Sequence, residues 1–164
     1  MNNPKELLKF AIILKDLSNE AFKELGSGFK EDTFQKALAI CLRQRNIDYL
    51  KETNIEIFFK NESLGGFRLD FLIPPQKNKS FHLSNAVVIE TKVSSGIKNP
   101  ARLQLKNYLE SLPKNKSKAL KDVSEGFIIN WHDGVDAKEK PSEGVDIELW
   151  QVKQKRFKEV ELNF

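Results

Sequence analysis

Hydrophobic periodicity divides the first half of the chain into helices followed by strands. Apolar residues recur at helical spacing over residues 5–25 and 29–45, which predicts two amphipathic helices. Apolar and polar residues then alternate over 54–60 and 67–73, and residues 86–93 are almost all apolar, so three strands follow. In the second of these strands, strict alternation predicts one face with Phe67, Leu69, Phe71 and Ile73 and another with Arg68, Asp70 and Leu72.

The second half of the chain continues with one helix and further strands. Residues 98–112 carry a helical apolar stripe, residues 114–122 are expected to form a loop, and residues 127–131 form a fourth strand. Residues 145–152 and 157–162 fit either a closing strand pair or a strand and a short helix. The predicted order is α-α-β-β-β-α-β with a C-terminal β extension. A chain with this order of elements belongs to the α/β class, with helices that cover a mixed sheet of the α+β kind.

Length and composition place the chain in one domain. With 164 residues we expect a single domain over 1–164, with a core at about 20–131 and an extension at 132–164. No apolar run is long enough for a membrane span, so no membrane partner is expected. Cys41 is the only cysteine, which excludes an intrachain disulfide and favours an intracellular location, in the cytoplasm or nucleus.

Charge is concentrated in one segment. Residues 98–121 hold seven basic side chains and one acid, which makes this segment +6 in a chain whose net charge is +4. A local basic excess suits a polyanion such as nucleic acid. A solvated lysine-rich loop explains the same charges, so charge alone leaves both interpretations open.

Three charged residues on neighbouring predicted strands carry the candidate chemistry. Glu90 and Lys92 are two positions apart on a strand and leave the same face, which is otherwise apolar. Asp70 lies on the preceding strand and comes beside Glu90 if the two strands pair. Two adjacent carboxylates repel unless a cation sits between them, and Mg²⁺ suits such hard oxygen ligands. The alternative is a structural ion pair at a strand end.

The acid-any-Lys pattern is short, and the chain contains it twice. The second copy runs from Asp136 to Lys138 in a polar stretch and is interpreted as a chance occurrence. The copy at Glu90 lies within an apolar strand and follows a strand that carries Asp70. The surrounding strands, and not the tripeptide, therefore mark Glu90 and Lys92.

Five segments, in order along the chain, resemble a known family. They are residues 25–34 (LGSGFKEDTF), 65–71 (GGFRLDF), 88–92 (VIETK), 102–109 (RLQLKNYL) and 126–130 (GFIIN). Together they resemble the PD-(D/E)XK nuclease superfamily and, within it, the compact GxxExxY group. The resemblance implies a restriction-endonuclease-like core and Mg²⁺-dependent cleavage of phosphodiesters, with Mn²⁺ as an alternative metal.

The resemblance also implies roles for individual residues. By position, Asp70 and Glu90 correspond to metal ligands, Lys92 to the catalytic lysine and Glu31 to a helical acid that completes the metal shell. Gln104 would point into the site from the next helix, with Tyr108 one turn further on the same face. Each helical residue has a plainer explanation. Glu31 can favour the helix dipole, Gln104 can face solvent, and Tyr108 can pack in the core.

Candidate nucleic-acid contacts come from the basic segment, residues 98–121, and from the predicted strand at residues 67–73. They are Arg68, Lys98, Arg102, Lys106, Tyr108, Lys114, Lys116 and Lys118. The chain departs from the group's pattern in having Phe34 where Tyr is usual and Leu69 before Asp70 in place of Pro. Its insertion at 74–85 and its tail beyond residue 131 also look longer than in compact members.

Two classes of function follow from these observations. The first is a nuclease, with DNA as the expected substrate, in which a metal-activated water attacks the phosphorus. The second is a catalytically inactive nucleic-acid-binding or assembly module with the same fold. Cleavage with a divalent metal distinguishes them. The oligomeric state, a homodimer included, is left open.

Overall fold

The structure, a computed structural model, describes residues 1–134 and 144–164. The helices are α1 (Pro4–Leu25), α2 (Glu31–Gln44) and α3 (Asn99–Ser111), and two 3₁₀ turns follow α3: η1 (Leu112–Lys114) and η2 (Lys118–Leu120). The strands are β1 (Leu50–Phe59), β2 (Glu62–Ile73), β3 (Gln76–Lys77), β4 (His82–Leu83), β5 (Val87–Ser94), β6 (Glu125–His132), β7 (Val145–Lys153) and β8 (Arg156–Val160).

Local signals explain where the first helix begins and ends. Asn3 precedes α1, and its side chain accepts a hydrogen bond from the N–H of Lys5. Pro4 occupies the first turn, where its missing N–H costs nothing. Gly26 ends the helix at φ 74°, in the left-handed region that glycine tolerates.

Six strands form one mixed sheet. Their order is β1-β2-β5-β6-β7-β8, and every neighbouring pair is antiparallel except β5 and β6. The parallel pair is joined by a crossover that contains α3, as parallel pairing requires. The sheet confirms the predicted mixed α/β class. It also decides the C-terminal alternative in favour of a strand pair.

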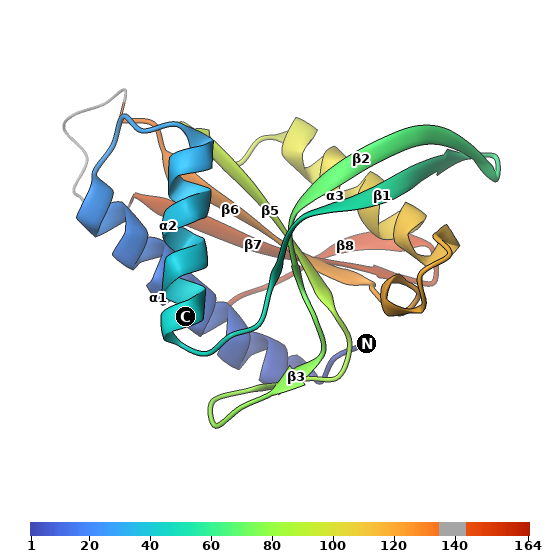
Figure 1. Cartoon of the computed structure of the whole chain (residues 1–164), viewed down its shortest axis with the longest axis horizontal. Coiled ribbons are helices and arrows are strands. Elements are labelled where there is room, and N and C mark those ends of the chain that lie inside the picture. Colours follow the sequence, from blue (N-terminus) through green and yellow to red (C-terminus); the bar gives the residue numbers. More distant parts are fainter. Residues whose placement is uncertain (135–143) are drawn as a thin grey trace.

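Helices cover both faces of this sheet and create two hydrophobic cores (Figure 1). On one face α1 and α2 pack together, and the buried Trp131 of β6 stacks on Phe34 with 5.1 Å between ring centroids. On the other face α3 packs closely, because Gly126 of β6 leaves room for Leu105. A Cβ added at position 126 would meet Leu105 Cδ1 at 2.7 Å.

The faces predicted for β2 were wrong in one respect. Leu69 belongs to the core under α3, whereas Phe71 belongs to the core under α1 and α2. The alternation fails because Asp70 and Glu52 fall between the pairs Lys51↔Phe71 and Thr53↔Leu69, and Glu52 has a φ of 57°. Asp70 therefore lies at an irregular position of its strand.

Two segments outside the predicted helices and strands contain short regular structure. The segment after Pro75 forms the small β3–β4 ladder, and the segment after α3 contains η1 and η2. Neither changes the order of the main elements. Within residues 1–134 and 144–164, none of the helices has the length and hydropathy needed to cross a membrane.

Candidate active site

The pairing of β2 with β5 brings Asp70 and Glu90 to one place. This antiparallel ladder pairs Ile73 with Val87 and ends at Phe71 with Ile89. One step further along the same register, Asp70 comes opposite Glu90, at the point where the two strands separate. The two carboxylates lie within electrostatic range of each other, because the charge of Asp70 raises the pKa of Glu90.

Glu90 is a buried carboxylate with an unsatisfied oxygen. Its exposure is 2%, and it faces the α3 side of the sheet beside Ile128 of β6. Its Oε1 accepts a hydrogen bond from Lys92 Nζ at 2.9 Å, whereas Oε2 is buried with no hydrogen-bond partner among the described residues. Burial and the neighbouring Asp70 raise the pKa of Glu90 to about 7 against the pull of Lys92.

Lys92 supplies the positive charge nearest to Glu90. Its side chain is 30% exposed, so the ammonium group is accessible from solvent while it contacts a buried acid. Burial lowers the pKa of Lys92, but Glu90, together with Glu31 and Asp70, outweighs this effect and leaves the pKa above its ordinary value. Lys92 therefore stays charged at neutral pH.

Thr91 connects three elements on the opposite side of β5. Its backbone N–H and its hydroxyl both donate to Asp70 Oδ2 at 2.8 Å. Gln35 of α2 donates from Nε2 to Thr91 Oγ1 at 2.8 Å and to Glu31 Oε1 at 3.2 Å. Thr91 and Gln35 thus fix the carboxylates of two different elements relative to each other.

Glu31 lies at the edge of this group, in the first turn of α2. Its Oε1 is 3.4 Å from Thr91 Oγ1, and the side chain is partly buried. Burial raises the pKa of Glu31, Lys92 lowers it and Asp70 raises it further, so the net pKa is above the ordinary value. Glu31 is therefore electrostatically coupled to Asp70 and Lys92 on the strands. A residue that only stabilises the helix dipole would not need this coupling.

Helix α3 contributes a tyrosine and a glutamine. Tyr108 is buried, and Gln104 donates from Nε2 to Tyr108 Oη at 2.7 Å. Burial raises the pKa of Tyr108, the hydrogen bond from Gln104 lowers it, and the charges of Glu90 and Asp70 raise it. Tyr108 thus lies within electrostatic range of the carboxylates, and the amide of Gln104 is oriented by Tyr108.

The predicted cations are distributed unevenly. Arg102 is paired within the fold, because its guanidinium donates to Glu148 of β7 at 2.5 and 2.9 Å. Lys106 lies 3.8 Å from Glu110 on its own helix, and Arg68 lies 3.9 Å from Glu52. The remaining predicted cations are exposed on either side of α3 and make no ion pair with another described residue: Lys98, Lys114, Lys116 and Lys118.

The sequence-based prediction omitted Thr91 and Gln35. Thr91 occupies the variable position of the tripeptide and points to the opposite face from Glu90 and Lys92, so it looked like an ordinary strand residue. Gln35 had a usable signal, since it follows Glu31 by four positions on a helix and such residues are neighbours. The second tripeptide, at Asp136 and Lys138, lies outside the described residues.

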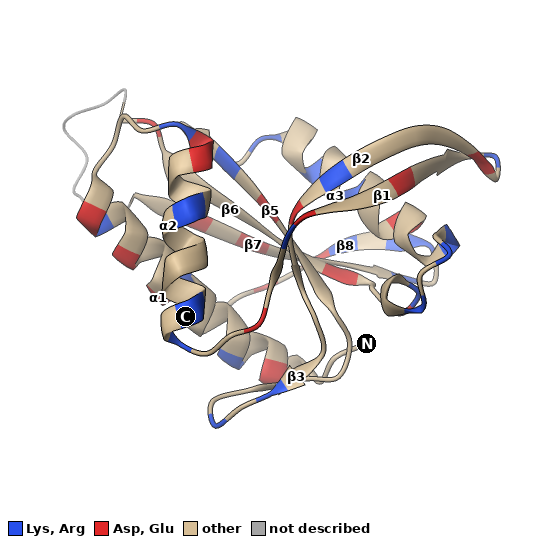
Figure 2. Cartoon of the chain, viewed as in Figure 1, with Lys and Arg blue, Asp and Glu red and all other residues tan. Residues whose placement is uncertain are grey.

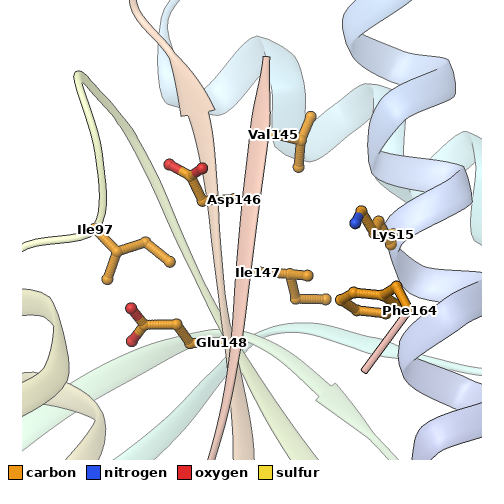
Figure 3. A pocket seen from close by; sticks show the side chains of 7 residues that line it. All are labelled: Lys15, Ile97, Val145, Asp146, Ile147, Glu148 and Phe164. Carbon is orange, nitrogen blue, oxygen red and sulfur yellow. The ribbon is translucent and has the colours of Figure 1, made fainter. Parts of the chain in front are cut away.

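A separate pocket of about 330 Å³ lies along β7 (Figure 3). Its lining residues are Lys15, Ile97, Val145, Asp146, Ile147, Glu148 and Phe164. The two carboxylates in it already have partners, because Asp146 lies 2.8 Å from His132 Nε2 and Glu148 binds Arg102. This pocket contains none of the predicted catalytic residues.

The donor set at Asp70 and Glu90 fits a hard divalent cation. The buried and unpartnered Glu90 Oε2 is a ligand atom that nothing else satisfies, and Asp70 supplies a second carboxylate nearby. Mg²⁺ takes one or two protein carboxylates and completes its shell with water and phosphate. Within residues 1–134 and 144–164, however, no group of three or more His, Cys, Asp or Glu is arranged so that it could hold a metal ion, so Asp70 and Glu90 are a pair of carboxylates without a third ligand in place.

Of three comparisons with known proteins, one identifies a family. A search of curated proteins gives no match. A solved structure titled "Crystal structure of SSO0001" aligns with a TM-score of 0.41 and 19% identity, and the alignment covers 80% of this chain and 50% of that one.

A family model for the PD-(D/E)XK nuclease superfamily matches residues 10–139. The match does not identify the GxxExxY group, which stays a prediction. Nucleases of this superfamily generally use divalent metals. Because the match spans most of the sequence, the chain belongs to the PD-(D/E)XK nuclease superfamily.

Proposed function

We propose that this chain is an active, metal-dependent nuclease that hydrolyses phosphodiester bonds in DNA. The observation that carries the proposal is the buried Glu90 Oε2, which has no partner among the described residues although Asp70 and Lys92 are adjacent. A carboxylate oxygen excluded from water and left unbonded is costly. A cation bound between Asp70 and Glu90 removes that cost.

A purely structural ion pair explains the observation less well. Such a pair needs hydrogen bonds to all its buried oxygens to offset desolvation, and Lys92 satisfies only one oxygen of Glu90. An inactive binding module likewise gains no stability from a second acid, Asp70, that raises the pKa of the first. The arrangement destabilises the metal-free fold locally, which is typical of a functional site.

Each residue then has a role that its position supports. Asp70 and Glu90 would hold Mg²⁺ or Mn²⁺, with Glu31 as the third acid that the family resemblance implies, and the metal would supply a water acidic enough to attack phosphorus at neutral pH and would stabilise charge on the phosphate. Lys92, charged and partly exposed, offsets negative charge that develops on the phosphate. Gln104 and Tyr108, which are hydrogen-bonded to each other, place polar groups on the α3 side of the carboxylates.

Cleavage of labelled DNA tests the proposal. Wild type, Glu90→Gln and Lys92→Met are compared in Mg²⁺, in Mn²⁺ and in a chelator, with RNA of the same sequence as a second substrate. Asp136→Asn is the matched control, because it alters the other acid-any-Lys tripeptide. We expect metal-dependent cleavage of DNA by wild type and the control only. Equal cleavage by all four proteins would remove the assignment, and preference for RNA would overturn the substrate.

A further inference from the structure

The C-terminal hairpin packs against the segment that follows α3. Val152 of β7 donates its N–H to the carbonyl of Ser124 at 2.8 Å. Trp150 and Phe157 stack on each other with 4.5 Å between ring centroids, and both pack against the core that includes Leu112 and Leu120. Residues 112–122 and 153–159, which are distant in sequence, therefore lie at the same end of the molecule.

This end of the molecule, here called the basic end, gathers eight exposed cations. They are Lys114, Lys116, Lys118 and Lys121 from the first segment and Lys153, Lys155, Arg156 and Lys158 from the second. Residues 112–122 and 153–159 contain two acids, Asp122 and Glu159, so these two segments together carry +6 while the whole chain carries +4. Figure 2 shows this positive charge at η1, η2 and the β8 side of the sheet.

These cations differ from those closer to the candidate active site. Arg102 and Lys106 lie beside Glu148 and Glu110, whereas none of the eight forms an ion pair with another described residue. Like charges held close together without counter-charges repel one another, and neutralisation by an external polyanion relieves this repulsion. The basic end is therefore a surface whose charge is not used within the fold.

We infer that the basic end binds the phosphate backbone of the nucleic acid on one side of the scissile bond, an inference that rests on the proposed nuclease function. Helix α3 connects the two places, because Tyr108 lies at the carboxylates and Lys114 follows six residues later. At helical rise this separation is on the order of 10 Å, or about three phosphates along one strand. The C-terminal hairpin thus extends the substrate-binding surface beyond the predicted segment.

The chemistry of the hairpin favours nucleic acid over an anionic membrane. A membrane-binding surface combines cations with exposed aromatic or aliphatic side chains that enter the lipid. The two aromatic residues of this hairpin, Trp150 and Phe157, pack instead into the core on the α3 side. The exposed side chains of residues 153–159 are all charged except Gln154, which suits electrostatic contact with phosphates.

Binding measurements on two charge-matched variants test the inference. The hairpin variant carries Lys153→Gln, Lys155→Gln, Arg156→Gln and Lys158→Gln. The control variant carries Lys5→Gln, Lys23→Gln, Lys77→Gln and Lys79→Gln, which are equally exposed and make no ion pair with a described residue. Affinity for a long duplex is measured in a chelator over a range of salt, together with cleavage in Mg²⁺ and the thermal midpoint of each protein.

We expect the hairpin variant to lose about tenfold or more in duplex affinity and its salt slope to fall by up to about 3, while the control variant keeps most of both. If wild type binds and cleaves DNA but the two variants lose affinity equally, the inference is wrong and the proposed function stands. If wild type neither binds nor cleaves DNA, the proposed function itself fails. If binding to phosphatidylserine vesicles, measured in parallel, is lost by the hairpin variant while its duplex affinity stays equal to that of the control variant, the ligand is an anionic membrane and the inference is wrong.

Discussion

Thr91 donates a hydrogen bond from its hydroxyl to Asp70 Oδ2 at 2.8 Å, and its backbone N–H donates to the same oxygen. The residue between Glu90 and Lys92 therefore positions the acid of the neighbouring strand. The register pairs of β2 with β5 end at Phe71, so Asp70 has no register partner on β5 among the described residues. The side chain of Thr91 holds Asp70 in place instead.

Replacing Thr91 by valine tests this positioning role. Thr91→Val keeps the branched shape but removes the hydroxyl, so Asp70 loses one anchor and Gln35 loses one acceptor. We expect the free energy of unfolding to fall by about 1–3 kcal/mol. We expect cleavage to fall more than that loss of folded protein explains, by roughly tenfold or more, because the carboxylate is no longer held in place.

Thr91→Ser is the matched control, since it restores the hydroxyl without the methyl group. Cleavage by the serine variant should return to within a few-fold of wild type when both are measured well below their melting temperatures. A serine variant as inactive as the valine variant would show that the methyl packing of Thr91 matters and the hydrogen bond to Asp70 does not.

Glu90 makes the stability of the metal-free protein depend on pH. Its pKa of about 7 when folded exceeds the ordinary 4.5, so the folded chain binds this proton more tightly than the unfolded chain does. The stabilisation is complete below about pH 4.5 and is lost as pH rises through about 7. Measured by denaturant unfolding in a chelator, wild type should lose up to about 3 kcal/mol relative to Glu90→Gln between about pH 4.5 and pH 8.

The comparison uses a difference between two proteins so that every group other than Glu90 contributes equally to both. Asp70, Glu31 and Lys92 surround Glu90 and are present in both. A stability difference that stays constant across this pH range would mean that Glu90 is ionised in the folded protein at acid pH, contrary to its burial.

Periodicity predicted most of the fold, because most elements have one buried face. The helices at α1 and α3 and the apolar strand β5 follow directly from that pattern. The irregular position at Asp70 could not be predicted, since it depends on the positive φ of Glu52 on the neighbouring strand. The C-terminal strand pair was undecided because the apolar residues of 157–162 suit either a strand or a short helix.

Part of the candidate site could likewise be predicted from the sequence, and part could not. Glu90 and Lys92 were recognisable because charged residues are unusual on a strand of this apolar character. The partner of Arg102 was not, because Glu148 lies 46 positions away on β7 and only the sheet order brings them together. Motif positions therefore emerged from the sequence, while the contacts that orient them needed the tertiary structure.

The close approach of α3 to the sheet depends on Gly126. An added Cβ would meet Leu105 Cδ1 at 2.7 Å and the carbonyl of Val88 at 3.3 Å, so the Leu105 side chain must move and the strand at Val88 must give way slightly. We expect Gly126→Ala to lower the free energy of unfolding by about 1–3 kcal/mol through overpacking. Gly66→Ala is the control, because its Cβ would have no neighbour closer than 4.0 Å. Equal melting temperatures for the two variants would contradict tight packing at α3.

Divalent metal should stabilise the folded protein through Asp70 and Glu90. A ligand at about 100 times its dissociation constant adds about 2.7 kcal/mol to folding, which in a domain of this size raises the melting temperature by about 5–10 °C. We expect this rise with Mg²⁺ or Mn²⁺ in wild type at about pH 8, where Glu90 is ionised.

Asp70→Asn and Glu90→Gln should abolish this rise in melting temperature, because each removes a ligand charge. Asp32→Asn should retain it, because Asp32 is exposed next to Glu31 and pairs with Lys36. Since scanning calorimetry reads the metal response without a substrate, the same rise in all four proteins would show that the metal binds elsewhere, whatever the cleavage assay finds.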